Sequence, residues 1–288
     1  MNCLSLNTPN YPPVLAWSKY ALKELWIAGE ANFGDEFCLA MVGTRSPSGL
    51  AASSVKNMVR TLKNSNVRIV SGLAQGVDSL CHAAAIENGL PTTAVIAQGL
   101  DVPLQGSQKI LADKILEHGG NIITPFAPGT RAFLSNFVKR NTIISGMSNA
   151  TLIVESRLKG GAMHTANFCA KENKPLFAMP GNPMSETSMG CNWLIYQKQA
   201  QAVWNVNELP NILGLNSLFG ALNTPHSSST PLIDDYENVP SWAAKGTMLQ
   251  IGELCEQSQK PVNEILSLLT ELEIQGKCSV KNGNVIFH

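Results

Sequence analysis

An arginine inside a run of small residues forms the first candidate site for a ligand. The apolar segment 37–42 leads into Gly-Thr-Arg-Ser-Pro-Ser-Gly at 43–49, where a helical pattern begins. Backbone N–H groups and the dipole at a helix N-terminus attract phosphate, and Arg45 adds a planar, permanently charged group that fits a pair of phosphate oxygens. Gly43, Arg45 and Ser46 are therefore candidate phosphate-binding residues. The alternative is that the glycines only permit a tight turn and that Arg45 is solvated.

This turn lacks the signatures of the common nucleotide-binding loops. Gly43 and Gly49 are six residues apart with Arg45 between them, which is not the G-x-G-x-x-G pattern, and the sequence contains no G-x-x-x-x-G-K-[ST]. Ser71 ends a second apolar segment, where an NAD site would carry an acidic residue for the ribose. The usual dinucleotide and nucleoside triphosphate sites are therefore disfavoured.

A second turn, Ser-Gly-Leu-Ala-Gln-Gly-Val-Asp at 71–78, opens another helical pattern. Ser71 and Gly72 are candidate ligand contacts here. We expect Asp78 to cap the helix. His82 lies one helical turn after Asp78 on the same face, which leaves an acid–base role open, although no matching nucleophile lies nearby in the sequence.

An aromatic residue, two cations and an amide stand together in the first turns of a helix expected from about residue 136. They are Phe137, Lys139, Arg140 and Asn141. Bases of single-stranded nucleic acid stack on such a ring at ~1–3 kcal/mol each, while cations follow the backbone. These four residues are candidate nucleic-acid contacts. The alternative is that Phe137 belongs to the core and that the cations form a solvated face.

A third turn places two adjacent glycines at the start of a helix expected over 162–172. Segment 125–175 contains seven basic and only two acidic residues in a chain whose formal net charge is zero. A local basic patch is therefore expected in an otherwise neutral protein. The candidate contacts of this region are Gly160, Gly161, Thr165, Lys171 and Lys174.

Three strand–turn–helix units must position these residues, at 37–49, 67–78 and 151–165. Strands that alternate with helices predict an α/β fold with a mostly parallel sheet and helices on both faces. Ligands of such sheets bind at the carboxyl ends of the strands. We therefore expect the three turns to face one shared crevice.

Composition divides the chain into four parts. Residues 1–36 are expected to pack as an extension on a main Rossmann-like domain at 37–213, and 214–240 has the Gly, Pro, Ser and Asn content of a linker. Residues 241–288 are expected to form two helices and a hairpin, the order of a small winged helix. Three lysines against five glutamates at 246–288 favour a protein-contact or regulatory role there over duplex binding.

Bulk properties exclude several classes of protein. The seven cysteines form no C-x-x-C pair, the first residues do not resemble a signal peptide, and no run of about 18 apolar residues is present. We therefore expect a cytoplasmic protein with reduced thiols, no membrane segment, no metal and no cofactor.

The ordered motifs resemble the DNA-processing protein A (DprA/Smf) family. They are YPPVL, VGTRSPSG, SGLAQGVDSLCHAAA, FVKRN, LIVE followed by GGAMHTA, LFAMPGNP and GCNWLI, which span most of 11–200. The resemblance implies an extended Rossmann-like domain, often with a C-terminal winged helix. It also implies a dimeric protein that binds single-stranded DNA without catalysis, protects incoming DNA and loads a RecA-type recombinase during natural transformation. Arg45, Phe137, Arg140 and Lys171 or Lys174 stand where that family holds DNA.

A second function stays open. Related folds, the lysine-decarboxylase-like phosphoribohydrolases, bind or process nucleoside monophosphates and carry a P-G-G-x-G-T-x-x-E loop. This chain has only Pro-Gly-Asn-Pro at 180–183, without the glutamate that follows in that loop.

Overall fold

The structure is a computed structural model that describes residues 2–6, 8–215, 248–250, 265, 269, 278–281 and 284–287. The chain divides into two compact units, Met1–Asn223 and Thr224–His288.

The first unit is built on a nine-stranded sheet. Its strands follow the order β1-β2-β6-β5-β4-β3-β7-β8-β9, and all neighbours are parallel except at β1 and β2. This arrangement confirms the predicted α/β class. The strands are β1 (Asn2–Ser5), β2 (Glu24–Ala28), β3 (Phe37–Val42), β4 (Val67–Ser71), β5 (Thr92–Val95), β6 (Asn121–Thr124), β7 (Ala150–Ile153), β8 (Leu176–Ala178) and β9 (Gln201–Ala202).

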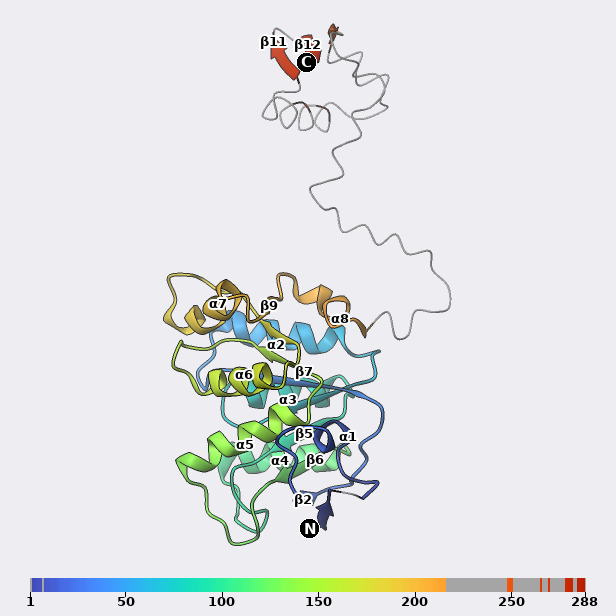
Figure 1. Ribbon diagram of the computed structural model, residues 1–288, viewed down its shortest axis with the longest axis vertical. Coiled ribbons are helices and arrows are strands. Elements are labelled where there is room, and N and C mark those ends of the chain that lie inside the picture. Colours follow the sequence, from blue (N-terminus) through green and yellow to red (C-terminus); the bar gives the residue numbers. More distant parts are fainter. Residues whose placement is uncertain are drawn as a thin grey trace. The chain divides into compact units, whose positions relative to one another are not determined.

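Helices cover both faces of the sheet, as predicted. One apolar cluster joins the sheet to α1, α5, α6 and α7, and two others join it to α2, α3, α8 and α4. In Figure 1, α5 and α6 lie in front of the sheet, and the fainter α3 and α4 lie behind it. The helices are α1 (Pro13–Ala16), α2 (Gly49–Thr61), α3 (Val77–Glu87), α4 (Gly106–Glu117), α5 (Leu134–Gly146), α6 (Gly161–Lys171), α7 (Met189–Tyr196) and α8 (Leu209–Ile212), with 3-10 turns η1 (Glu186–Ser188) and η2 (Val206–Glu208).

Strand β3 is the point at which the strand order reverses. It pairs with β4 on one side and with β7 on the other. The segments that leave these neighbouring strands diverge to opposite faces of such a sheet and leave a crevice at the carboxyl ends. The predicted turns after residues 42, 71 and 153 all open at this edge.

Residues 2–28 extend the sheet with two antiparallel strands. Strand β2 pairs with β6 in a register that places Trp26 opposite Thr124.

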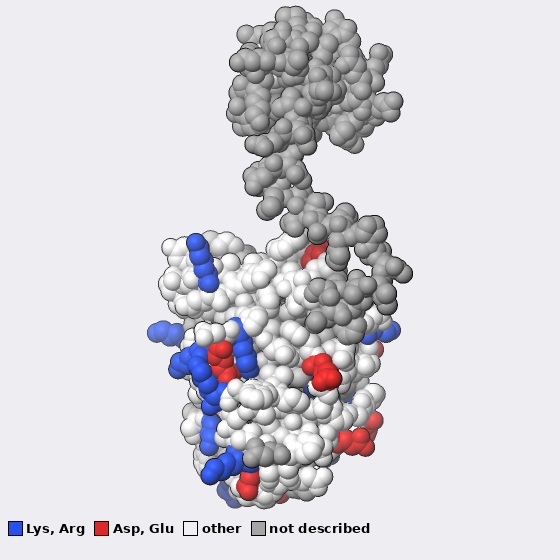
Figure 2. Space-filling model, turned by 45° about the vertical axis from the view of Figure 1, so that its right-hand side comes forward, with Lys and Arg blue, Asp and Glu red and all other residues white. Residues whose placement is uncertain are grey.

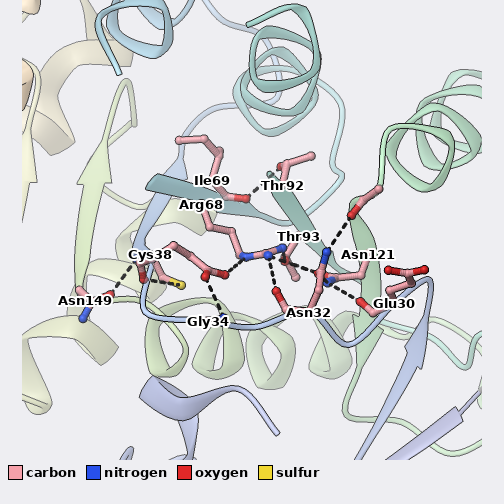
Figure 3. Close-up of polar contacts among 12 residues, drawn as sticks. Glu30, Asn32, Gly34, Cys38, Arg68, Ile69, Thr92, Thr93, Asn121 and Asn149 are labelled. Carbon is pink, nitrogen blue, oxygen red and sulfur yellow. Dashed lines mark hydrogen bonds and ion pairs between the residues drawn. The ribbon is translucent and has the colours of Figure 1, made fainter. Parts of the chain in front are cut away.

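The segment between β2 and β3 contacts Arg68 of β4, whose side chain is only 2% exposed. Its guanidinium forms a 2.5 Å ion pair with Glu36 and donates to the Asn32 carbonyl at 2.9 Å and to Thr93 Oγ1 at 3.2 Å (Figure 3). The buried charge is thus fully partnered at the end of the sheet opposite the crevice.

In the second unit the structure describes a three-stranded antiparallel sheet in the order β10-β12-β11. Its strands are β10 (Met248–Gln250), β11 (Cys278–Lys281) and β12 (Asn284–Phe287). Strands β11 and β12 pair as the predicted hairpin does, with Lys281 opposite Asn284. The predicted linker beyond residue 215 and most of the two predicted helices lie outside the described residues, so the winged helix stays a prediction. Among the described residues, none of the helices has both the length and the apolar character that crossing a bilayer requires.

Candidate functional site

A pocket of about 250 Å³ opens at the carboxyl edge of the sheet, beside β3. We call it the switch-point pocket. It is built from the ends of β3 and β7 with their turns, the start of α3, the first half of α5 and the start of α6. Its lining residues are Val42, Gly43, Thr44, Arg45, Ala74, Asp78, Phe137, Arg140, Asn141, Ser156, Arg157, Gly160, Gly161, Ala162 and Thr165.

Two arginines lie close to the Phe137 ring. The guanidinium carbon of Arg45 is 5.5 Å from the ring centroid, and that of Arg140 is 5.9 Å away. Both distances lie within the range of cation–π attraction. An aromatic surface and two permanent positive charges therefore meet in one hollow, although Arg45 is far from the other two residues in the sequence.

Arg140 forms part of the pocket wall and is only 4% exposed. Its Nη1 donates to the Val95 carbonyl at 2.8 Å. A side chain at position 72 would overlap this guanidinium, so Gly72 provides the space in which it lies. Burial lowers the pKa of Arg140 to about 10, and the Asp78 carboxylate opposes that shift. The guanidinium therefore keeps its charge at neutral pH.

Asp78 is not the helix cap that the sequence predicts. Gly76 occupies the cap position of α3, and Asp78 lies inside the first turn. Its Oδ2 accepts the Gly72 N–H at 3.1 Å. Burial raises the pKa of the carboxyl, whereas the Arg140 guanidinium and backbone N–H groups lower it. The carboxylate stabilises the buried arginine and fixes the Gly72 turn.

His82 has no acid–base role in this pocket. Its buried Nδ1 lies 2.8 Å from Thr92 Oγ1, and that hydroxyl donates to the Ile69 carbonyl at 2.9 Å. The imidazole must therefore donate from Nδ1. Burial, together with the Arg140 guanidinium, lowers the pKa of His82 to about 3. The ring is neutral and structural.

The buried histidine predicts a pH dependence of stability. An unfolded histidine has a pKa of ~6.5, so between about pH 6.5 and pH 3 the unfolded chain holds a proton that folded His82 does not. The contribution of His82 to the free energy of unfolding is complete above that range. It falls by ~1.4 kcal/mol for each pH unit as the pH drops through the range. Urea unfolding at pH 7.5, 6.0 and 5.0 measures this slope.

His82→Gln is the matched comparison. Because the pKa of Asp78 is raised, Asp78 makes the free energy of unfolding rise toward low pH, and it does so equally in the wild type and in the variant. The difference between the two proteins therefore isolates His82. The wild-type free energy of unfolding should fall more steeply toward low pH than that of the variant. Parallel curves for the two proteins would contradict the assignment.

The loop that carries Arg45 is fixed to the end of β7. The Thr44 N–H donates to the Glu155 carbonyl, and the Ser48 N–H donates to Glu155 Oε2, both at 2.8 Å. Ser48 then begins α2 by accepting the Ala51 N–H. Arg45 is thus an exposed side chain on a fixed loop. Ser46 is exposed on the same loop but does not line the pocket.

The start of α6 faces the pocket without a capping side chain. Gly160 is the cap residue, and no side chain accepts its first N–H groups. A β-carbon at position 160 would clash with Ser156, so the turn requires glycine there. Asn141 reaches across from α5 and donates to the Gly161 carbonyl at 3.4 Å, and Thr165 is buried in the wall. Uncapped N–H groups of this kind suit an anion.

Two predicted contacts near β4 have other roles. The buried Ser71 hydroxyl donates to the Met41 carbonyl of β3 at 2.6 Å, so it holds two strands together rather than facing the pocket. Gly72 lies beneath the guanidinium of Arg140 and is covered by it. The prediction that these residues face a ligand is corrected accordingly.

Three predicted lysines lie away from the pocket. Lys139 is exposed, with its Nζ 5.6 Å from the Phe126 ring centroid. Lys171 is the last residue of α6, whose first residue lines the pocket. Lys174 donates to the Ser145 and Gly146 carbonyls at the end of α5 and pairs with Glu172 at 3.1 Å, which makes it a structural cation. Lys171 and Lys174 therefore do not line the pocket, and their role as DNA contacts stays a prediction.

The sequence reading missed Arg157, which lines the pocket from the turn after β7. Its position in a predicted strand–turn–helix unit was the available signal. The Pro-Gly-Asn-Pro turn at 180–183 does not line the pocket, and Gly181 bonds instead to the Asn192 side chain.

Comparisons with known proteins identify relatives of this chain. A family model described as DNA recombination-mediator protein A matches residues 2–214. Protein Smf of Escherichia coli (strain K12) is 30% identical over 96% of this chain and 74% of its own length. DNA processing protein DprA of Streptococcus pneumoniae is 36% identical over 55% of this chain and 56% of its own length.

Two solved structures share the fold. DNA processing protein A from Streptococcus pneumoniae superposes with a TM-score of 0.67 at 32% identity, covering 72% of this chain and 73% of the other. DNA processing protein A from Helicobacter pylori, described for its single-stranded DNA binding mode, gives a TM-score of 0.66 at 25% identity, covering 74% and 97%.

Proposed function

Because this chain belongs to the DNA recombination-mediator protein A family, we propose that its switch-point pocket binds single-stranded DNA without altering the strand chemically. The observation that carries this proposal is the convergence of Arg45 and Arg140 on the Phe137 ring. Single-stranded nucleic acid needs a stacking surface and cations beside it. The relative from Helicobacter pylori, described as binding single-stranded DNA, supports the same assignment.

Each part of the pocket has a task in this proposal. A base stacks on Phe137, and the neighbouring phosphate lies between Arg45 and the uncapped start of α6. Arg140 adds positive potential from the wall, and its burial restrains its position. The buried Asp78, already bonded to Gly72, is the lone carboxylate among the lining residues and remains a support for Arg140.

Arg45→Ala should weaken binding to oligo-dT by about 1–3 kcal/mol, the range for a charge-assisted hydrogen bond to phosphate. The side chain is exposed on a loop held by backbone bonds, so the fold should not change. Fluorescence anisotropy titrations of a labelled oligo-dT across several salt concentrations measure the loss. The salt slope should also decrease by about one counterion.

The matched control for this titration is Lys56→Ala, which removes one exposed cation from α2, away from the lining residues. Its affinity should equal that of the wild type. Equal losses in the two variants would show that bulk charge, rather than the pocket, governs binding.

We also propose that the protein is a homodimer. The segment 184–204 exposes several large apolar side chains at the β9 edge of the sheet, including Tyr196 at 76% and Trp204 at 71%. Trp193 is half-exposed, and its ring lies 6.0 Å from that of Tyr196. Exposed apolar patches of this kind mark interfaces.

The double variant Trp193→Asp, Tyr196→Asp should therefore be a monomer when the wild type is a dimer. Light scattering after gel filtration measures the mass, which is 30.9 kDa for one chain. Ile110→Asp, which changes an exposed apolar residue on α4, is the control and should keep the wild-type mass. A monomeric wild type would contradict the proposal.

The proposed role extends to recombination and to natural transformation. The bound strand is protected and then passed to a RecA-type recombinase, in keeping with the family description as a recombination mediator. A strand-exchange assay tests this step: the protein should speed recombinase assembly on DNA that is covered by single-strand-binding protein.

A further inference from the structure

We infer that the DNA strand bound in the switch-point pocket continues along α6 to a second contact built around Trp17. This inference rests on the proposed function. The Trp17 side chain is 93% exposed at the end of α1. We call Trp17, Lys19, Tyr20, Phe168 and Lys171 the Trp17 platform.

The platform is held firmly at the far ends of the two pocket helices. Ser18 Oγ donates to the Glu172 carboxylate at 2.5 Å, and Lys19 Nζ donates to the Lys171 carbonyl at 2.9 Å. A β-carbon on Gly146, the last residue of α5, would meet Leu15 and Ser18. In Figure 1, α1 lies beside the end of α5. The exposed Trp17 ring therefore projects from a fixed support.

Two aromatic rings and a lysine lie together on this support. The Tyr20 and Phe168 rings meet edge to face at 5.5 Å, and the Lys171 ammonium lies 6.0 Å from the Phe168 ring centroid. The Glu172 carboxylate, which lies next to Lys171 in the chain, accepts a hydrogen bond from Ser18 and pairs with Lys174, so its negative charge is already neutralised. Figure 2, which brings the α1 side of the molecule forward, shows Lys and Arg side chains gathered along one side of that face.

An exposed face of α6 joins the pocket to the platform. His164, Asn167 and Lys171 recur at helical spacing and are accessible or partly accessible, while Gly161 at the other end lines the pocket. The eleven residues from 161 to 171 span about 15 Å, or roughly four stacked nucleotides at ~3.4 Å each. A strand of modest length would therefore reach both contacts.

The charge of the platform favours DNA over a protein partner. Lys19 is two residues from Trp17 and bonds to Lys171, whose ammonium lies beside the Phe168 ring, whereas the residues proposed for the dimer surface at 184–204 are exposed aromatic and methionine side chains. A ring beside cations is the combination that stacks bases and neutralises phosphates. The occupant is thus the same single strand that fills the pocket.

Oligonucleotide length tests this inference. Labelled dT20 should reach both contacts, whereas dT2, which is shorter than the path along α6 and is measured by competition, should fill the pocket alone. Trp17→Ala should weaken dT20 binding about tenfold and leave dT2 binding unchanged. Lys171→Ala should lower the salt slope for dT20 by about one, with Lys56→Ala as the control. Arg45→Ala should weaken binding of both lengths.

The outcomes separate the two proposals. If Arg45→Ala weakens binding but Trp17→Ala binds dT20 as the wild type does, the strand path is wrong and the pocket stands. If the wild type binds neither length, the proposed function itself fails. An equal loss on dT2 and dT20 in Trp17→Ala, or a change of mass with unchanged DNA affinity, would overturn the platform as a DNA contact.

Discussion

Replacing Arg140 with alanine should destabilise the folded protein by about 3–5 kcal/mol, the cost of leaving a buried charge without its partner. The guanidinium is nearly inaccessible, shares the Gly72 turn with the Asp78 carboxylate and satisfies the Val95 carbonyl. Its removal leaves the buried Val95 carbonyl without this donor and the buried Asp78 carboxylate without a neighbouring cation. Urea unfolding at pH 7.5 measures the change, and oligo-dT binding should fall as well, because the cation behind Phe137 is lost.

The double variant Arg140→Ala, Asp78→Asn is the matched control. An asparagine still accepts the Gly72 N–H but carries no charge, so much of the lost stability should return. DNA affinity should stay low in both variants, which separates the structural effect from the binding effect. A single Arg140→Ala variant as stable as the wild type would disprove the account of the buried pair.

Gly76→Ala should destabilise the protein by roughly 2–5 kcal/mol, from a left-handed backbone and from overpacking. Gly76 has φ +95°, and an added β-carbon would lie 2.6 Å from the Arg45 Cα. That contact is with backbone, which cannot rotate away. The substitution should therefore also displace the loop between Thr44 and Ser48, and with it the phosphate contact of Arg45.

Gly89→Ala provides an internal comparison at the other end of α3. Its φ is +71°, yet nothing lies within 4 Å of an added β-carbon. This variant should show the conformational cost alone, about 1–2 kcal/mol, with unchanged oligo-dT binding. Thermal unfolding of the two variants, together with titration of each, measures the difference. If the two variants lost equal stability and bound oligo-dT equally well, the contact between the Arg45 loop and the start of α3 would contribute nothing to stability or binding.

The strand and helix periods predicted most of the first unit. Apolar runs such as 37–42 and 67–71 can only be buried in a sheet that is covered on both faces, and the glycines after them marked the turns correctly. The order of the strands in the sheet could not be predicted in the same way. Nothing in the local pattern indicates that β2 joins β6 rather than β3, because that choice depends on packing between distant residues.

Arg140 illustrates what the sequence already contained about the site. It recurs at i, i+3, i+4 and i+7 with Ile143, Ile144 and Met147, which are all buried. This spacing is that of a helical face directed at the core. That stripe indicates a buried arginine rather than a surface cation.

Lys174 carried no comparable signal. Its two carbonyl partners belong to the end of α5, 28 and 29 residues earlier in the chain. Ser71 likewise has its partner on another strand, the Met41 carbonyl. Local charge and side-chain type could not distinguish these bonded groups from groups that are free to meet a ligand.

The antiparallel edge of the sheet has a consequence for synthesis on the ribosome. β1 and β2 leave the exit tunnel before β6, with which β2 pairs and which ends at Thr124. Nearly a hundred further residues must therefore be translated before this hairpin finds its place. Until then, its backbone N–H and C=O groups form an open edge that other nascent chains could join. Slowing translation ahead of residue 124 should lengthen that exposure and increase demand for chaperones.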